Sequence, residues 1–104
     1  MRSPEVRRVL DQGRPRHGKR VVVFLGPGSG SWAVLATRRV GGAVERNRAK
    51  RILREAWKQV SPQVTRDRDA VLVAREAIRG ATTQDLVSEM IELLPPEGSH
   101  DDSA

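Results

Sequence analysis

Three short runs of β-branched and aromatic residues along the chain predict β-strands. They cover residues 20–25 (RVVVFL), 32–38 (WAVLATR) and 69–75 (DAVLVAR). The loop between the first two, 26–31, reads GPGSGS, and glycine-rich loops of this kind are typical of turns. We therefore expect these two strands to form a hairpin. The basic segment 13–19 leaves room for one further short strand.

Apolar residues at helical spacing predict three helices. The first covers residues 4–12, and the second is a long helix from about 43 to 60. The last helix begins at Thr82 or Thr83 and carries apolar residues up to Leu94. Thr82 and Asp85 have the spacing of a capping box, which would fix its start.

The resulting order, α-β-β-α-β-α, predicts an α+β fold in which a small central sheet is covered by helices, as in a two-layer sandwich. The last strand has to reach the sheet by a crossover through the long helix. We expect a single domain over residues 1–95, because a chain of about 100 residues supports one core. The polar, acidic segment 96–104 is expected to be a disordered tail.

The composition excludes several classes of protein. The 104 residues include no cysteine, so neither disulfides nor thiolate chemistry is available. No apolar run approaches the roughly 18 residues of a membrane span. The charged N-terminal segment lacks the apolar core of a secretory signal. We therefore expect a cytoplasmic protein without membrane contact.

An active site built by the protein alone is not indicated. The two histidines, His17 and His100, are isolated, with no nucleophile and base around them. Asp67 and Asp69 flank the start of a strand, and we interpret them as turn residues rather than a metal pair. The GPGSGS loop lacks the GK[ST] ending of a phosphate-binding loop. We expect no metal bound by the protein itself.

The charge is distributed very unevenly. Residues 1–58 carry 15 basic and 4 acidic side chains, a net +11, whereas residues 59–104 carry 4 basic and 9 acidic ones, a net −5. Sixteen of the 19 basic residues are arginine, whose planar guanidinium binds phosphate in a bidentate manner. A high arginine count alone could reflect genome composition, but it would not explain the clustering. The clustering indicates a localised surface for a polyanion.

The long helix combines an apolar stripe with rows of cations. On a helical wheel the stripe is formed by Ala49, Ile52, Leu53, Ala56 and Val60, with Trp57 at its border. The opposite side carries one row of Arg46, Lys50 and Arg54 and a second row of Asn47, Arg51 and Lys58. Arg48 and Glu55 lie on the far flank of the helix.

Two interpretations of these rows compete. A charged helix face is usually only solvated, but solvated faces tend to alternate in sign, whereas Arg46, Lys50 and Arg54 place like charges one turn apart. Arg46 and Arg48 also crowd the early turns, where the helix dipole favours acidic residues. Both features favour binding of a polyanion. Since no helix-turn-helix pattern precedes the segment, structured RNA is favoured over DNA.

Residues 40–55, VGGAVERNRAKRILRE, resemble the RNR signature of the bacterial ribonuclease P protein component. In that family two basic residues that end a strand, here Arg38 and Arg39, precede the signature. The resemblance extends less sharply over residues 4–94. It implies an α/β sandwich, similar to the second domain of ribosomal protein S5, with a left-handed βαβ crossover through the RNR helix.

The resemblance also implies a function. The protein would be the subunit of ribonuclease P that pairs with a catalytic RNA, and the holoenzyme would remove the 5′ leader of precursor tRNA with magnesium bound by the RNA. The implied RNA contacts are Arg38, Arg39, Arg46, Asn47, Arg48, Lys50, Arg51 and Arg54. A cleft for the leader would be lined by Val6, Leu10, Val22 and Phe24. No obligate protein partner is expected. The alternative is a non-catalytic, basic RNA-binding protein of ribosomal or RNA-chaperone type.

Overall fold

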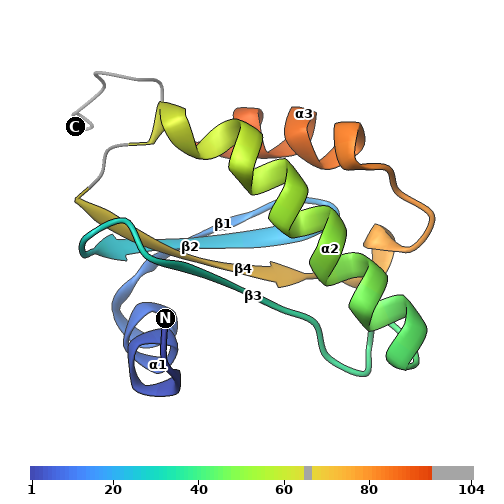
Figure 1. Cartoon of the computed structure of the whole chain (residues 1–104), viewed down its shortest axis with the longest axis horizontal. Coiled ribbons are helices and arrows are strands. Elements are labelled where there is room, and N and C mark those ends of the chain that lie inside the picture. Colours follow the sequence, from blue (N-terminus) through green and yellow to red (C-terminus); the bar gives the residue numbers. More distant parts are fainter. Residues whose placement is uncertain (65–66, 95–104) are drawn as a thin grey trace.

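The computed structural model describes residues 1–64 and 67–94. This part of the chain forms three α-helices and four strands (Figure 1). In chain order the elements are α1 (Ser3–Gln12), β1 (Arg14–His17), β2 (Val21–Pro27), β3 (Trp32–Leu35), α2 (Ala43–Val60), β4 (Arg68–Ala74) and α3 (Thr83–Leu93). Two short 3-10 helices follow α2 and β4, at Ser61–Gln63 and Glu76–Ile78. The predicted α+β class is confirmed, and the expected tail at 96–104 lies outside the described residues.

The four strands form one mixed sheet in the order β1-β2-β4-β3. β2 is antiparallel to both β1 and β4, whereas β3 runs parallel to β4. Helices α2 and α3 cover one face of the sheet, and α1 lies on the opposite face (Figure 1). We call the face beneath α1 the open face, because among the described residues this single short helix is the one element that covers it.

The hairpin predicted between the strands at 20–25 and 32–38 is wrong. β4 lies between β2 and β3, so the 26–31 loop crosses the end of β4 instead of making a tight turn. β4 suits the central place because its apolar run at 70–74, AVLVA, can pack on both faces of the sheet. Its residues from Asp69 to Leu72 are accordingly buried. Glycine-rich loops serve hairpins and crossings alike, so the loop sequence could not separate the two.

The other strand predictions were closer. The further strand allowed for in segment 13–19 exists as β1, and it forms the edge beyond β2. The strand predicted at 32–38 ends earlier, at Leu35. Arg38 and Arg39 therefore do not end a strand. They lie in a turn closed by the bonds from the Val40 N–H to the Thr37 carbonyl and from the Gly41 N–H to the Arg38 carbonyl.

The main core lies between the sheet and the pair α2 and α3. Alternate residues of β2 (Val21, Val23, Leu25) and β4 (Ala70, Leu72, Ala74) face it. Helix α2 contributes the whole predicted stripe, and Trp57, predicted at the border, is only 3% exposed. A smaller contact lies on the open face, where Val9 of α1 and Val71 of β4 are fully buried.

Local bonds fix where the helices begin. At α3 the Thr82 hydroxyl accepts from the Asp85 N–H and the Asp85 carboxylate accepts from the Thr82 N–H, so the predicted capping box is confirmed. At α2 the Glu45 carboxylate accepts from the Gly42 N–H. Gly41 has φ +144°, a conformation that side chains rarely adopt. Because the turn into α2 requires this conformation, glycine is needed there.

Candidate nucleic-acid interface

The outer side of α2 carries the predicted cations. Six apolar residues of the helix point into the core, so its polar residues must lie outside or on its flanks. Asn47, Arg51 and Arg54 are exposed, and Lys50 is half-buried. Within residues 1–64 and 67–94, neither Lys50, Arg51 nor Arg54 forms an ion pair or a side-chain hydrogen bond. Their positive charges are therefore available to an outside anion.

The remaining two cations of the signature each make one bond within the protein. Arg46 donates from Nη1 to the Gly41 carbonyl at 3.3 Å, which ties the helix to the turn before it. Arg48 donates from Nη2 to the Ala81 carbonyl at 2.8 Å, on the side of α3. Since a guanidinium has five N–H donors, most of each group is left for a ligand. We call Arg46, Asn47, Arg48, Lys50, Arg51 and Arg54 together the basic face.

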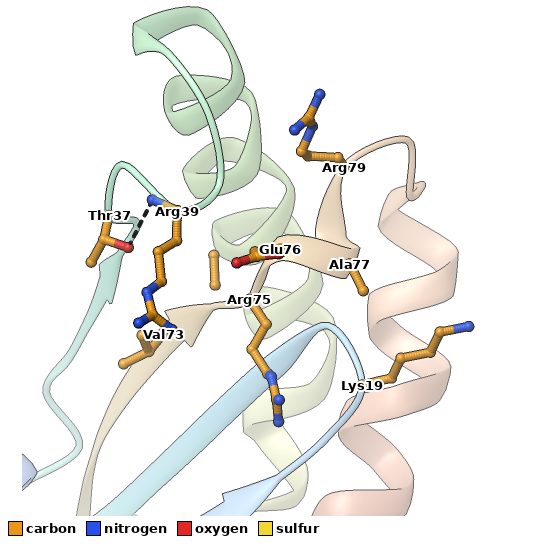
Figure 2. A pocket seen from close by; sticks show the side chains of 9 residues that line it. Lys19, Thr37, Arg39, Val73, Arg75, Glu76, Ala77 and Arg79 are labelled. Carbon is orange, nitrogen blue, oxygen red and sulfur yellow. Dashed lines mark hydrogen bonds between the residues drawn. The ribbon is translucent and has the colours of Figure 1, made fainter.

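Further basic residues line a hollow at the end of the sheet, although the ends of their side chains point in different directions (Figure 2). Its basic side chains come from four separate segments: Lys19 between β1 and β2, Arg39 in the turn before α2, Arg75 after β4, and Arg79 after the second 3-10 helix. Glu76 is its one acidic lining residue. In the part of the chain that the structure describes, no ion pair involves these five side chains. We call this site the basic hollow.

The basic hollow was missed from the sequence, except for Arg39. Lys19, Arg75 and Arg79 are scattered over 61 positions, and only the sheet order brings them together. One usable signal was the position of Arg75, which is the last residue of the predicted strand 69–75. Arg75 is also held in place, because its Nη1 donates to the Gly18 carbonyl at 3.0 Å.

The open face holds the four residues predicted to line a leader cleft. Val22 and Phe24 alternate with the core residues of β2, so they point to the open face. Val6 and Leu10 flank the buried Val9 on α1, which packs over β2 and β4. All four side chains are half-buried. We call Val6, Leu10, Val22 and Phe24 the open-face group.

The open-face group and the basic hollow adjoin each other. Val73, which lines the hollow, is the cross-strand partner of Val22 on one side and of Leu35 on the other. Directly paired residues share a face of the sheet. The hollow therefore opens beside the open-face group, and Arg39 connects it to the turn before α2.

A buried carboxylate fixes the far end of the sheet. Oδ1 of Asp69 accepts from the N–H groups of Ser29, Gly30 and Ser31 at 2.9, 3.1 and 2.9 Å. Oδ2 accepts from Nη2 of Arg8 at 2.8 Å. Burial alone would raise the pKa of Asp69, but the N–H groups of Ser29 and Ser31 and the Arg8 guanidinium lower it overall.

The interpretation of Asp69 as a turn residue is therefore wrong. Asp69 lies inside β4 and is 4% exposed, because the crossing loop folds over its carboxylate. A side chain at Gly28 would collide with that carboxylate. Asp67, by contrast, is exposed outside the strand.

Within the described ranges, no three acidic or histidine side chains lie close enough together to form a metal site. None of the described helices has both the length and the apolar character of a membrane span.

Known proteins match this chain in both sequence and fold. The family model for ribonuclease P matches residues 1–96. The ribonuclease P protein component of Chloroflexus aurantiacus is 37% identical over an alignment of 90 positions, which covers 81% of this chain and 67% of that protein. The corresponding component of Maridesulfovibrio salexigens is 31% identical over an alignment of 104 positions, which covers 94% of this chain and 82% of the relative.

Two solved structures share the fold. The ribonuclease P protein of Thermotoga maritima superposes with a TM-score of 0.75 at 18% identity, over 90% of this chain and 93% of that one. The ribonuclease P protein of Staphylococcus aureus superposes with a TM-score of 0.73 at 20% identity, over 89% of this chain and 88% of that one. The family match over the whole described chain shows that this protein belongs to the ribonuclease P protein family.

Proposed function

We propose that this protein docks on the catalytic RNA of ribonuclease P through its basic face and holds the 5′ leader of precursor tRNA on the open face of its sheet. As a member of the family, the chain is a subunit of a holoenzyme that processes tRNA 5′ ends. The proposal concerns how its residues serve that activity. The family match favours it over a ribosomal or RNA-chaperone role.

One observation carries the docking half of the proposal. Helix α2 buries six apolar residues on one side and presents Lys50, Arg51 and Arg54 on the other, without an internal ion pair in the described residues. Like charges one turn apart repel each other in the free protein. A phosphate backbone relieves this repulsion and releases its own counterions, so RNA binding is favoured. Arg38 and Arg39 extend the surface beyond the start of the helix.

The leader half rests on the neighbouring surfaces. Phe24 offers an aromatic ring for base stacking in a group that is otherwise aliphatic. The basic hollow beside it has the charge to bind a backbone phosphate, and arginine and lysine are the usual residues for this task. A leader strand would thus place a base on Phe24 and a phosphate near Arg39 and Arg75.

The chemistry is assigned to the RNA subunit in this proposal. The family resemblance implies that the RNA binds the magnesium that supports hydrolysis. The protein would contribute by positioning the precursor and by neutralising phosphate charge, which lowers the magnesium concentration that the RNA needs.

Replacing Phe24 with alanine is expected to weaken binding of precursor tRNA to the holoenzyme about tenfold and to leave mature tRNA unaffected. The reason is that stacking of a base on an aromatic side chain contributes roughly 1–3 kcal/mol. The measurement is the dissociation constant of each tRNA for the holoenzyme. Phe24→Leu, which keeps an apolar side chain, separates stacking from packing and should show most of the loss.

Two results would count against the leader site. Equal losses for precursor and mature tRNA would indicate damage to the fold. Unchanged binding of both would place the leader elsewhere. Ile91→Ala serves as the matched control, because Ile91 is an exposed apolar residue on α3, on the other side of the sheet.

A further inference from the structure

Helix α1 is attached to the sheet by very few groups. It has 10 residues, and Val9 is its one buried residue. Isolated helices of this length are only marginally stable in water. Its place over the open face must therefore depend strongly on its remaining contacts with the sheet and loops.

Arg8 supplies two of these contacts. Its Nη1 donates to the Pro27 carbonyl at 3.0 Å, and its Nη2 donates to Oδ2 of Asp69 at 2.8 Å. The acceptors lie at the end of β2 and the start of β4. The Arg8 side chain is 37% exposed and that of Asp69 only 6%, so the bond joins a surface helix to a buried anchor.

The Asp69 anchor is itself rigid. Its other oxygen accepts the three N–H groups of the crossing loop, so the carboxylate cannot turn without losing them. A guanidinium that bridges two fixed acceptors defines both a distance and a direction. Val6 and Leu10 lie on either side of Arg8 along α1. The two bonds of Arg8 therefore set the distance of these side chains from Val22 and Phe24.

We propose that Arg8 is a positioning residue, which through Asp69 and the Pro27 carbonyl holds α1 over the open face and thereby sets the fit of the leader of precursor tRNA. This inference rests on the proposed leader site. It assigns a specific task to two residues outside the signature, one of them in the helix and one in the central strand.

The test compares Arg8→Met with Arg7→Met in the assembled holoenzyme. Both variants lose one positive charge from α1, but Arg7 is exposed and makes no side-chain hydrogen bond within the described residues. The readout is discrimination, defined as the dissociation constant of mature tRNA divided by that of precursor tRNA. We expect Arg8→Met to lower discrimination about fivefold, which is less than the full strength of the two lost bonds because the packing of Val9 remains, and Arg7→Met to leave it unchanged.

Two further variants separate positioning from folding. Arg8→Lys can reach Asp69 but cannot bridge to Pro27 as well, and should restore part of the discrimination. Asp69→Asn keeps an oxygen for the loop N–H groups and turns an amide N–H₂ toward Arg8. It should lower discrimination as Arg8→Met does, and the double variant should lose no more than either single one. In Arg8→Met, amide hydrogen exchange should be faster in α1 than in the original protein and unchanged in α2.

The inference is overturned if Arg8→Met and Arg7→Met show the same discrimination, or if α1 exchanges at the same rate in both. Phe24→Ala, measured in parallel, shows which statement has failed. A loss of discrimination with Phe24→Ala but not with Arg8→Met overturns only the positioning role. No loss with either variant overturns the leader site and the positioning role together.

Discussion

Replacing Lys50, Arg51 and Arg54 together with glutamine is expected to weaken binding of the catalytic RNA about 100- to 1000-fold at 0.1 M salt. Each phosphate contact changes the slope of log K against log salt by roughly 0.7–0.9, which corresponds to nearly tenfold in affinity at that salt. The plot for the variant should therefore be shallower by about two to three units. None of the three side chains makes an internal hydrogen bond in the described structure, and glutamine maintains the helix.

The matched control replaces Arg7, Arg14 and Arg68 with glutamine. These three residues are exposed on α1, β1 and β4, so the control removes the same charge without touching the basic face. It should change the slope far less. If both triple variants lower the slope equally, binding responds to net charge alone. An unchanged slope in the first variant would remove α2 from the interface.

Replacing Asp69 with alanine is expected to destabilise the protein by about 3 kcal/mol and to lower its Tm by roughly 10–20 °C. The change removes the acceptor of three N–H groups and of the Arg8 guanidinium at once. Thermal unfolding followed by circular dichroism measures the effect. Asp67→Ala is the control, because Asp67 is exposed and makes no side-chain hydrogen bond in the described part of the chain. Its Tm should stay within a few degrees of the original.

The stabilisation by Asp69 should also depend on pH. Its pKa is lowered from 3.8 in the folded protein, so folding favours the ionised form. A lowered folded pKa stabilises the protein fully above the ordinary value, and this contribution is lost as the pH falls through the folded pKa. The difference in stability between the original protein and Asp69→Asn should therefore be constant near pH 7 and shrink below about pH 4. A difference that grows on acidification would contradict this assignment.

The long helix could be predicted in detail because its determinants are local. The 3.6-residue repeat separates Ala49, Leu53 and Val60 from the cations, and the structure buries these three residues as expected. The capping box of Thr82 and Asp85 spans only four positions, and it was predicted correctly for the same reason. Spacing within one helix is fixed by backbone geometry alone.

The sheet order could not be read in this way. Which strand lies next to β2 depends on how well β4 fills the centre, and this is a property of the assembled core. The environment of Asp69 followed from the same arrangement, since the loop reaches its carboxylate only when β4 lies between β2 and β3. The basic hollow likewise forms only when the turn that follows β3, with Arg39, lies beside Arg75 at the end of the parallel strand β4.

The role as a ribonuclease P subunit is tested most directly by cleavage of precursor tRNA. A ribonuclease P RNA is incubated with precursor tRNA at a magnesium concentration too low for the RNA to act alone, with and without the purified protein. We expect the protein to increase the rate of 5′-leader removal, and the variant without Lys50, Arg51 and Arg54 to require a much higher concentration for the same effect. No increase at any protein concentration, with RNA binding still present, would contradict the assignment.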